Sequence, residues 1–240
     1  MILDVLRKSE FGDLAKLCSP RLFSVLPALS LARSVKNLMA SRDAKRHAAI
    51  CAKHADVHRN DGVAIAKTLP VRTKLDEAER IAAGSRLLRV YFRELFFAEE
   101  ALLDLRPNAI AFAADHLDWA PAALSVTWDP AFLRGLRDTY RGFYGGDDAG
   151  FRRGLDALGL TKAETLFRQH FGEDPSAVRF STRDFTHTFG LVFEACAKEH
   201  VKLSGDFVAF GFLLAALYQS LESLDVPLDV RTAFVQATTS

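Results

Sequence analysis

Two histidines lie four residues apart in a segment that we expect to be helical. At this spacing His54 and His58 share one face of a helix, so both imidazoles can reach a single metal ion, and His47 lies seven residues earlier on nearly the same face. Arg46 and Lys53 make the surroundings basic, whereas metal sites usually add a carboxylate or a thiol. We therefore expect a solvated surface cluster here, with metal binding as the alternative.

A second set of possible metal ligands falls on the helix expected at residues 182–201. His187 and Glu194 are seven residues apart and share a face, and His200 follows near the end of the helix. Such residues can bind iron or manganese in a helical bundle, as a metal-dependent oxygenase requires, with further ligands from Glu99, Glu100 or His116. The diagnostic Glu-x-x-His pairing is missing, so we expect a solvated polar face and keep the metal centre as the alternative.

Phenylalanine is unusually frequent, with 19 Phe against four Tyr and two Trp. Phe fills an interior without needing a hydrogen-bond partner, so this bias indicates a large dry core or a cavity for an apolar ligand. Candidates for such a pocket are Tyr91, Phe92, Phe96, Phe97, Phe189 and Phe193. Aromatic residues at helical spacing more often pack in a core, which is the competing interpretation.

Several function classes lack their signatures. The chain has no glycine-rich phosphate loop and no Gly-x-Ser-x-Gly elbow, so we expect neither a nucleotide cofactor nor a serine hydrolase. The formal net charge is +1, and the basic segment at residues 42–59 has no interleaved aromatic residues, which argues against nucleic-acid binding. We expect Cys18, Cys51 and Cys196 to be reduced, buried thiols.

No stretch is long and apolar enough to predict a transmembrane helix, and the first residues do not resemble a secretory signal. We therefore expect a cytoplasmic protein.

The elements that must hold these residues are mostly helices. Their apolar spacing predicts an all-α, multi-helix bundle with a short β-hairpin around residues 109–128. We expect residues 63–70 to form an irregular or short helical link. The helices are expected at residues 2–17, from 19, 27–58, 73–105, 129–144, 147–158, from 161, 182–201 and 204–223, with a last turn-rich helix after 226.

Local residues predict where several helices begin and end. Asp129-Pro130 is a typical helix start, Gly145-Gly146 is a stop, and Asp147 caps the next helix. Gly84 is expected to bend or divide the long helix around it. We expect residues 1–240 to form a single helical domain, with a possible seam between two packed lobes near residues 106–129.

The last hundred or so residues carry a family resemblance. The run Trp128-Asp-Pro-Ala-Phe-Leu-Arg-Gly-Leu-Arg-Asp-Thr-Tyr-Arg-Gly-Phe-Tyr-Gly-Gly-Asp147 and the segments 151–159, 202–208 and 221–229 resemble the helical C-terminal region of the UbiB/AarF family of atypical kinases. The phosphate-holding lysine, the catalytic loop and the Asp-Phe-Gly triplet of kinases have no counterpart here. The resemblance implies a kinase-less relative linked to isoprenoid quinone or lipid handling.

Three functions follow as hypotheses. The first is a non-catalytic helical binding module for an apolar small molecule, lipid-like or isoprenoid-like, or for a partner protein. The second is the metal-dependent helical-bundle oxygenase, and the third is a helical subunit of a protein assembly. The sequence favours the first by a small margin.

Overall fold

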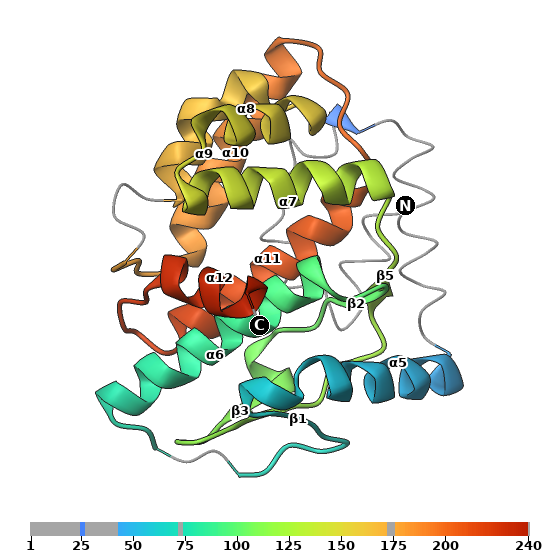
Figure 1. Ribbon diagram of the computed structural model, residues 1–240, viewed down its shortest axis with the longest axis vertical. Coiled ribbons are helices and arrows are strands. Elements are labelled where there is room, and N and C mark those ends of the chain that lie inside the picture. The colour runs from blue at the N-terminus through green and yellow to red at the C-terminus, as the bar shows by residue number, and fades with distance from the viewer. Residues whose placement is uncertain (1–24, 27–42, 72–73, 172–175, 240) are drawn as a thin grey trace. The chain divides into compact units, whose positions relative to one another are not determined.

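A computed structural model describes residues 25–26, 43–71, 74–171 and 176–239 of the chain (Figure 1). The chain divides into two compact units. Unit 1 comprises Met1–Asn37, Trp128–Glu173 and Thr182–Ala215. Unit 2 comprises Leu38–Thr127, Asp174–Ser181 and Ala216–Ser240. The helix expected at residues 2–17, Cys18, the start of the helix expected from residue 19, and residues 27–42 of the helix expected at 27–58 lie outside the described residues.

Unit 2 contains two helices that hold the candidate site. Helix α5 (Ala44–Val57) begins where the Asp43 side chain accepts a hydrogen bond from the backbone N–H of Arg46. Helix α6 (Glu77–Phe96) begins with a complete capping box between Asp76 and Glu79. The start expected at Thr73 was therefore wrong, because a better cap lies three residues further along.

Helix α6 is continuous through Gly84, contrary to the expected bend. A Cβ at Gly84 would lie 2.7 Å from a methyl carbon of Leu228, so glycine here permits close packing. Helix α12 (Val230–Thr238) packs on α6, and the ring of Phe234 meets Phe92 and Phe96 edge-on.

Unit 2 also contains five short strands among its described residues. β3 (Ile110–Phe112) and β4 (Leu117–Trp119) pair antiparallel, which confirms the expected hairpin, and β1 (Val63–Ile65) adds to β4 in parallel. β2 (Ala101–Leu102) pairs antiparallel with β5 (Ser125–Val126). The expected link at 63–70 is irregular at residues 66–70, but residues 63–65 form a strand instead. The expectation of helix up to Leu105 was wrong, because α6 ends at Phe96 and Ala101–Leu102 pairs with a distant strand.

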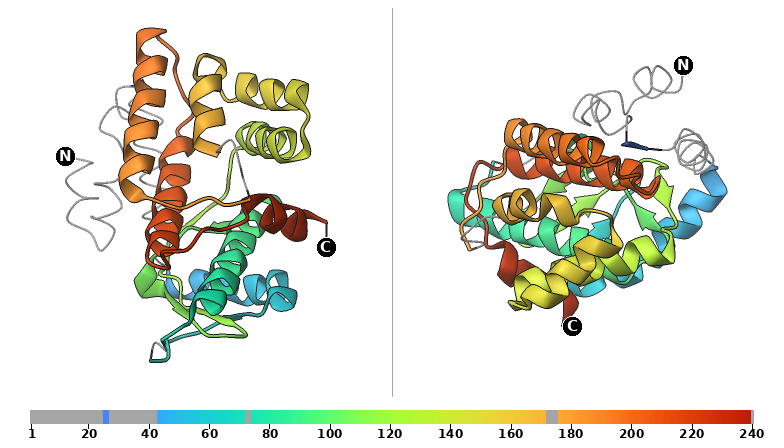
Figure 2. Two further views of the ribbon diagram at one scale, coloured as in Figure 1. Left: turned by 90° about the vertical axis from the view of Figure 1, so that its left-hand side faces the viewer. Right: turned by 90° about the horizontal axis from the view of Figure 1, so that it is seen from above.

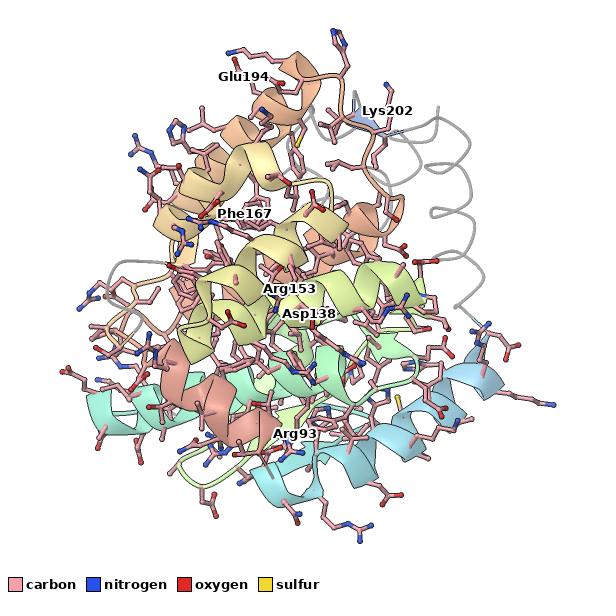
Figure 3. The ribbon with its side chains drawn as sticks, turned by 45° about the horizontal axis from the view of Figure 1, so that its top comes forward. Arg93, Asp138, Arg153, Phe167, Glu194 and Lys202 are labelled. Atoms are coloured by element: carbon pink, nitrogen blue, oxygen red, sulfur yellow. The ribbon has the colours of Figure 1, made fainter. Side chains whose placement is uncertain are left out.

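A turn leads from α5 into β1, and ion pairs join this turn to α6. A 3-10 turn (Arg59–Asp61) and Gly62, in the left-handed region at φ 67°, end the helical segment as expected from Asn60-Asp61-Gly62. The buried Asp61 forms ion pairs with Arg89 and Arg93 of α6, of which Arg93 is labelled in Figure 3. A second 3-10 turn (Pro107–Ala109) precedes β3.

Unit 1 is built from helices among its described residues. Asp129 caps α7 (Pro130–Gly145), Gly146 ends it in the left-handed region, and Asp147 caps α8 (Asp148–Ala157), all as predicted. A 3-10 turn (Thr161–Ala163), α9 (Glu164–Phe171) and α10 (Thr182–Lys198) follow. Helix α11 (Asp206–Glu222) carries residues 206–215 in unit 1 and residues 216–222 in unit 2. Figure 2 shows α7 to α10 in yellow-green to orange.

The described chain is thus mostly helical with a small mixed sheet, and the expectation of a plain all-α bundle is corrected. None of the helices in the described ranges has the length and apolar character needed to cross a membrane.

Candidate functional site

The buried face of α5 carries histidines where a core helix ordinarily carries apolar residues. Ile50, His54 and His58 follow one another at intervals of four residues, and all three are buried. His54 is 3% exposed and His58, which caps the C-terminus of α5, is fully buried. The expected solvated surface cluster was therefore wrong for these two residues.

Glu94 of α6 lies opposite the two histidines and is fully buried. Its Oε1 atom is 2.7 Å from Nδ1 of His54 and 2.7 Å from Nε2 of His58. Its Oε2 atom accepts a hydrogen bond of 2.7 Å from the backbone N–H of Leu102, the last residue of β2. One carboxylate thus joins α5, α6 and β2.

The hydrogen bonds shift the pKa values of Glu94 and His54. Burial by itself would raise the pKa of Glu94, but the hydrogen bonds and charges of His54 and His58 outweigh it and lower the pKa below its ordinary value. Burial would likewise lower the pKa of His54, but the bond to Glu94, its charge and the Glu100 carbonyl raise it. Glu94 is therefore an anion, available as a ligand for a cation.

Trp119 of β4 closes the group from the sheet side. Its ring is edge-on to His54 at 6.4 Å and to His58 at 5.7 Å between ring centroids. Nε1 of Trp119 donates a hydrogen bond of 2.7 Å to the Asp104 carbonyl, which holds the indole in place. The imidazoles are therefore confined on one side by a rigid aromatic wall.

A groove of about 720 Å³ borders the same face of α5. Apolar side chains of Ala49, Ile50, Val57, Phe97 and Ala98 line it. The remaining lining residues are Arg46, Lys53, His54, Glu99, Glu100 and Thr127. His54 therefore belongs both to the buried group and to the groove.

The charges around the groove are paired with one another. Nη2 of Arg46 lies 2.7 Å from Oε1 of Glu100, which also accepts a hydrogen bond of 2.6 Å from Ser125. Lys53 lies 3.5 Å from Glu99 across the exposed rim. The groove therefore offers apolar contact and short polar networks rather than an excess of one charge.

The six aromatic candidates fall in different places. Tyr91, Phe92 and Phe96 are buried in unit 2, where the last two contact Phe234. Phe97 is 46% exposed and lines the groove. Phe189 and Phe193 are buried on α10 of unit 1, where Phe189 contacts Phe167 of α9, labelled in Figure 3. Of these six, the groove includes Phe97.

The possible metal ligands at residues 182–201 do not converge on one point. His187 and His200 are exposed, and Glu194, near the C-terminal end of α10 in Figure 3, forms an ion pair of 3.2 Å with Lys198. In the part of the chain that the structure describes, His54, His58 and Glu94 are the one group of three potential ligands that converges. His47 lies outside this group and faces Pro121, with its Nε2 atom 3.0 Å from the carbonyl.

Glu94 was missed by the sequence analysis, although a signal was present. It follows Leu87 by seven residues and Tyr91 by three, so it occupies an apolar position of the helical period. A carboxylate at such a position needs a partner, and two histidines at helical spacing provide one. Cys196 is buried as expected, and Cys51 is half-buried beside His47.

No model of a known protein family matches the chain, and a search among curated proteins finds no match. The similarity to the UbiB/AarF family stays a prediction.

Proposed function

We propose that the chain is a binding protein that takes a small molecule with an apolar body into the groove along α5. The observation that carries this proposal is the groove itself, whose volume of about 720 Å³ falls within the range of small-molecule sites, about 300–1,000 Å³. Its apolar residues come from two segments, α5 and residues 97–98.

The pairing of the rim charges indicates how the ligand is selected. Arg46 is held by Glu100, and Lys53 faces Glu99, so a charged ligand would first have to compete with these partners. Burial of apolar surface needs no such exchange. An uncharged or weakly polar lipid-like or isoprenoid-like molecule therefore suits the groove.

The expected affinity is moderate. A ligand of about 20 non-hydrogen atoms at about 0.3 kcal/mol per atom gains about 6 kcal/mol, which corresponds to a Kd of tens of micromolar. A partner protein that inserts an apolar side chain is the second occupant that the groove admits.

Ala49 and Ala48 provide a matched pair of variants for the test. Both are exposed on α5, but Ala49 lines the groove, whereas Ala48 does not and lies about 100° around the helix. Ala49→Trp should fill the groove, and Ala48→Trp adds the same side chain elsewhere.

The measurement is the fluorescence of the uncharged methyl ester of cis-parinaric acid titrated with the full chain, followed by displacement with farnesol. We expect saturable binding that Ala49→Trp weakens at least about tenfold and Ala48→Trp leaves unchanged. Binding of equal strength in Ala49→Trp and the unchanged chain would place the ligand elsewhere. Failure of both probes to bind would favour the partner protein over the small molecule.

A further inference from the structure

We propose that His54, His58 and Glu94 bind a divalent first-row transition metal ion, for which Zn²⁺ is the best match. The two imidazole nitrogens and the carboxylate oxygen lie within 4.8 Å of one another, and all three residues are buried. Two nitrogen ligands favour zinc and its neighbours over Mg²⁺ or Ca²⁺, which prefer oxygen.

The backbone already sets the spacing that a metal needs. His54 and His58 are one helical turn apart on α5, and Glu94 comes from α6, so the ligands belong to two regular elements. Each nitrogen lies 2.7 Å from Oε1 of Glu94. A tetrahedral ion with bonds of about 2.0–2.1 Å separates its ligand atoms by about 3.3–3.4 Å, so each of these two nitrogen–oxygen contacts would open by about 0.6 Å, and the two nitrogens, which lie within 4.8 Å of each other, would adjust to the same separation.

A second layer of contacts orients these ligands. Nε2 of His54 lies 2.9 Å from the Glu100 carbonyl, so its proton stays there and leaves Nδ1 to face Glu94 and the metal. The Leu102 N–H holds the other oxygen of Glu94 at 2.7 Å. Metal-binding histidines and carboxylates ordinarily have such partners, which fix the tautomer and the orientation of the ligand.

Hydrogen bonding alone leaves His58 incompletely satisfied. Its side chain is fully buried, but Nδ1 has no hydrogen-bond partner among the residues that the structure describes. A buried polar atom without a partner destabilises a fold, and neither the bond to Glu94 nor coordination through Nε2 gives Nδ1 a partner. The metal proposal therefore rests on the convergence of Nε2 with the ligand atoms of His54 and Glu94.

Three protein ligands leave a coordination position for water or for another ligand, as in zinc sites with two histidines and one glutamate. His54 also lines the groove, so the metal would lie beside the space where we place the small molecule. The metal proposal nevertheless rests on the three side chains alone and does not require that the groove be occupied.

The test uses the full chain, stripped with a chelator and titrated with Co²⁺, whose visible absorption reports its coordination. Zn²⁺ is then added as a competitor. We expect one Co²⁺ per chain, displaced by Zn²⁺, and binding weakened more than about 100-fold in Glu94→Gln and in His58→Gln, since loss of an outer contact alone weakens binding about 10–100-fold. His47→Gln should bind as the unchanged chain does, because His47 lies on the same helix outside the group.

Absence of Co²⁺ binding in the unchanged chain would overturn the proposal, and so would equal binding in folded Glu94→Gln and His58→Gln. If these variants do not fold, as judged by circular dichroism, X-ray absorption of the zinc-loaded unchanged chain decides instead. Two imidazoles with oxygen ligands would support the site. A sulfur ligand, which Cys51 could supply near His47, or a shell of oxygen alone would overturn it.

Discussion

Glu94 connects three elements of unit 2, namely α5, α6 and β2. Its carboxylate meets His54 and His58 of α5 and the N–H of Leu102, and it has no exposure to solvent. Two factors act on such a group in opposite directions: burial disfavours its charge, and the surrounding donors favour it. The donors outweigh burial, so the net shift of the pKa of Glu94 is downward.

Removing the charge of Glu94 should therefore cost much of the stability of the fold. With chelator present, Glu94→Gln should lower the free energy of unfolding by about 3–5 kcal/mol, because the amide leaves the facing donors without an anion. Urea denaturation followed by circular dichroism measures this. The control is Glu99→Gln, whose side chain is 89% exposed and should show little change. Similar midpoints for both variants would contradict the buried network.

At the scale of single residues, the sequence predicted part of the site. The interval between His54 and His58 identified the pair, but their basic neighbours suggested a solvated face. The burial of the pair depends on α6 and Trp119, which are distant in sequence. A single sequence does not reveal which helix covers another, so Glu94 could be noticed only as a charge at an apolar position.

Among the elements, α7 and α8 show how glycine permits close packing. A Cβ at Gly142 would overlap the backbone nitrogen of Phe151, and one at Gly154 would overlap that of Thr139. Neither neighbour can move away as a flexible side chain could. The two helices therefore approach at positions where only glycine fits.

Gly142→Ala should lower the free energy of unfolding by at least about 1–3 kcal/mol, because the added methyl group meets backbone atoms. Gly145→Ala is the matched control on the same helix, since nothing lies within 4 Å of its added methyl group. It should be neutral or stabilise the protein by up to about 0.5–1 kcal/mol through helix propensity. Thermal and chemical denaturation compare the two variants, and equal destabilisation would contradict the close approach.

Asp206, the first residue of α11, should make the stability of the fold depend on pH. Burial raises the pKa of Asp206 above its ordinary 3.8; a hydrogen bond from Ser204 lowers it, the charge of Asp129 raises it further, and the net shift is upward. The folded state therefore binds this proton more tightly than the unfolded state. The resulting stabilisation is lost as pH rises from 3.8 through the folded-state pKa.

The variant Asp206→Asn has no carboxyl group at this position, so it cannot bind or release this proton. The free energy of unfolding of the unchanged chain, minus that of the variant, should fall as pH rises across this window and become constant above it. Urea denaturation at a series of pH values measures the difference. Parallel curves for the two proteins would show that Asp206 titrates normally.

Elements with local signals were predicted well, and elements that depend on distant pairing were not. Asp129, Gly146 and Asp147 act through contacts within a few residues, and their caps appear as predicted. The strand β1 exists because Val63–Ile65 pairs with Leu117–Trp119, about fifty residues away. Its short apolar sequence favours neither strand nor helix without that partner.

At the scale of the whole molecule, the binding features lie in unit 2. The groove, the two histidines, Glu94 and the strands behind them all belong to it. Unit 1 contributes Phe-rich helices whose rings contact one another, as Phe167 and Phe189 do. The abundance of Phe thus has one explanation in core packing, and Phe97 shows a second at the groove.

The most direct test of binding by unit 2 is native mass spectrometry of the full chain, with elemental analysis of the same sample, before and after addition of Zn²⁺ and farnesol. We expect one zinc ion per chain and a mass increase that matches one bound farnesol. The mass of the polypeptide alone under every condition, with no metal retained, would contradict it.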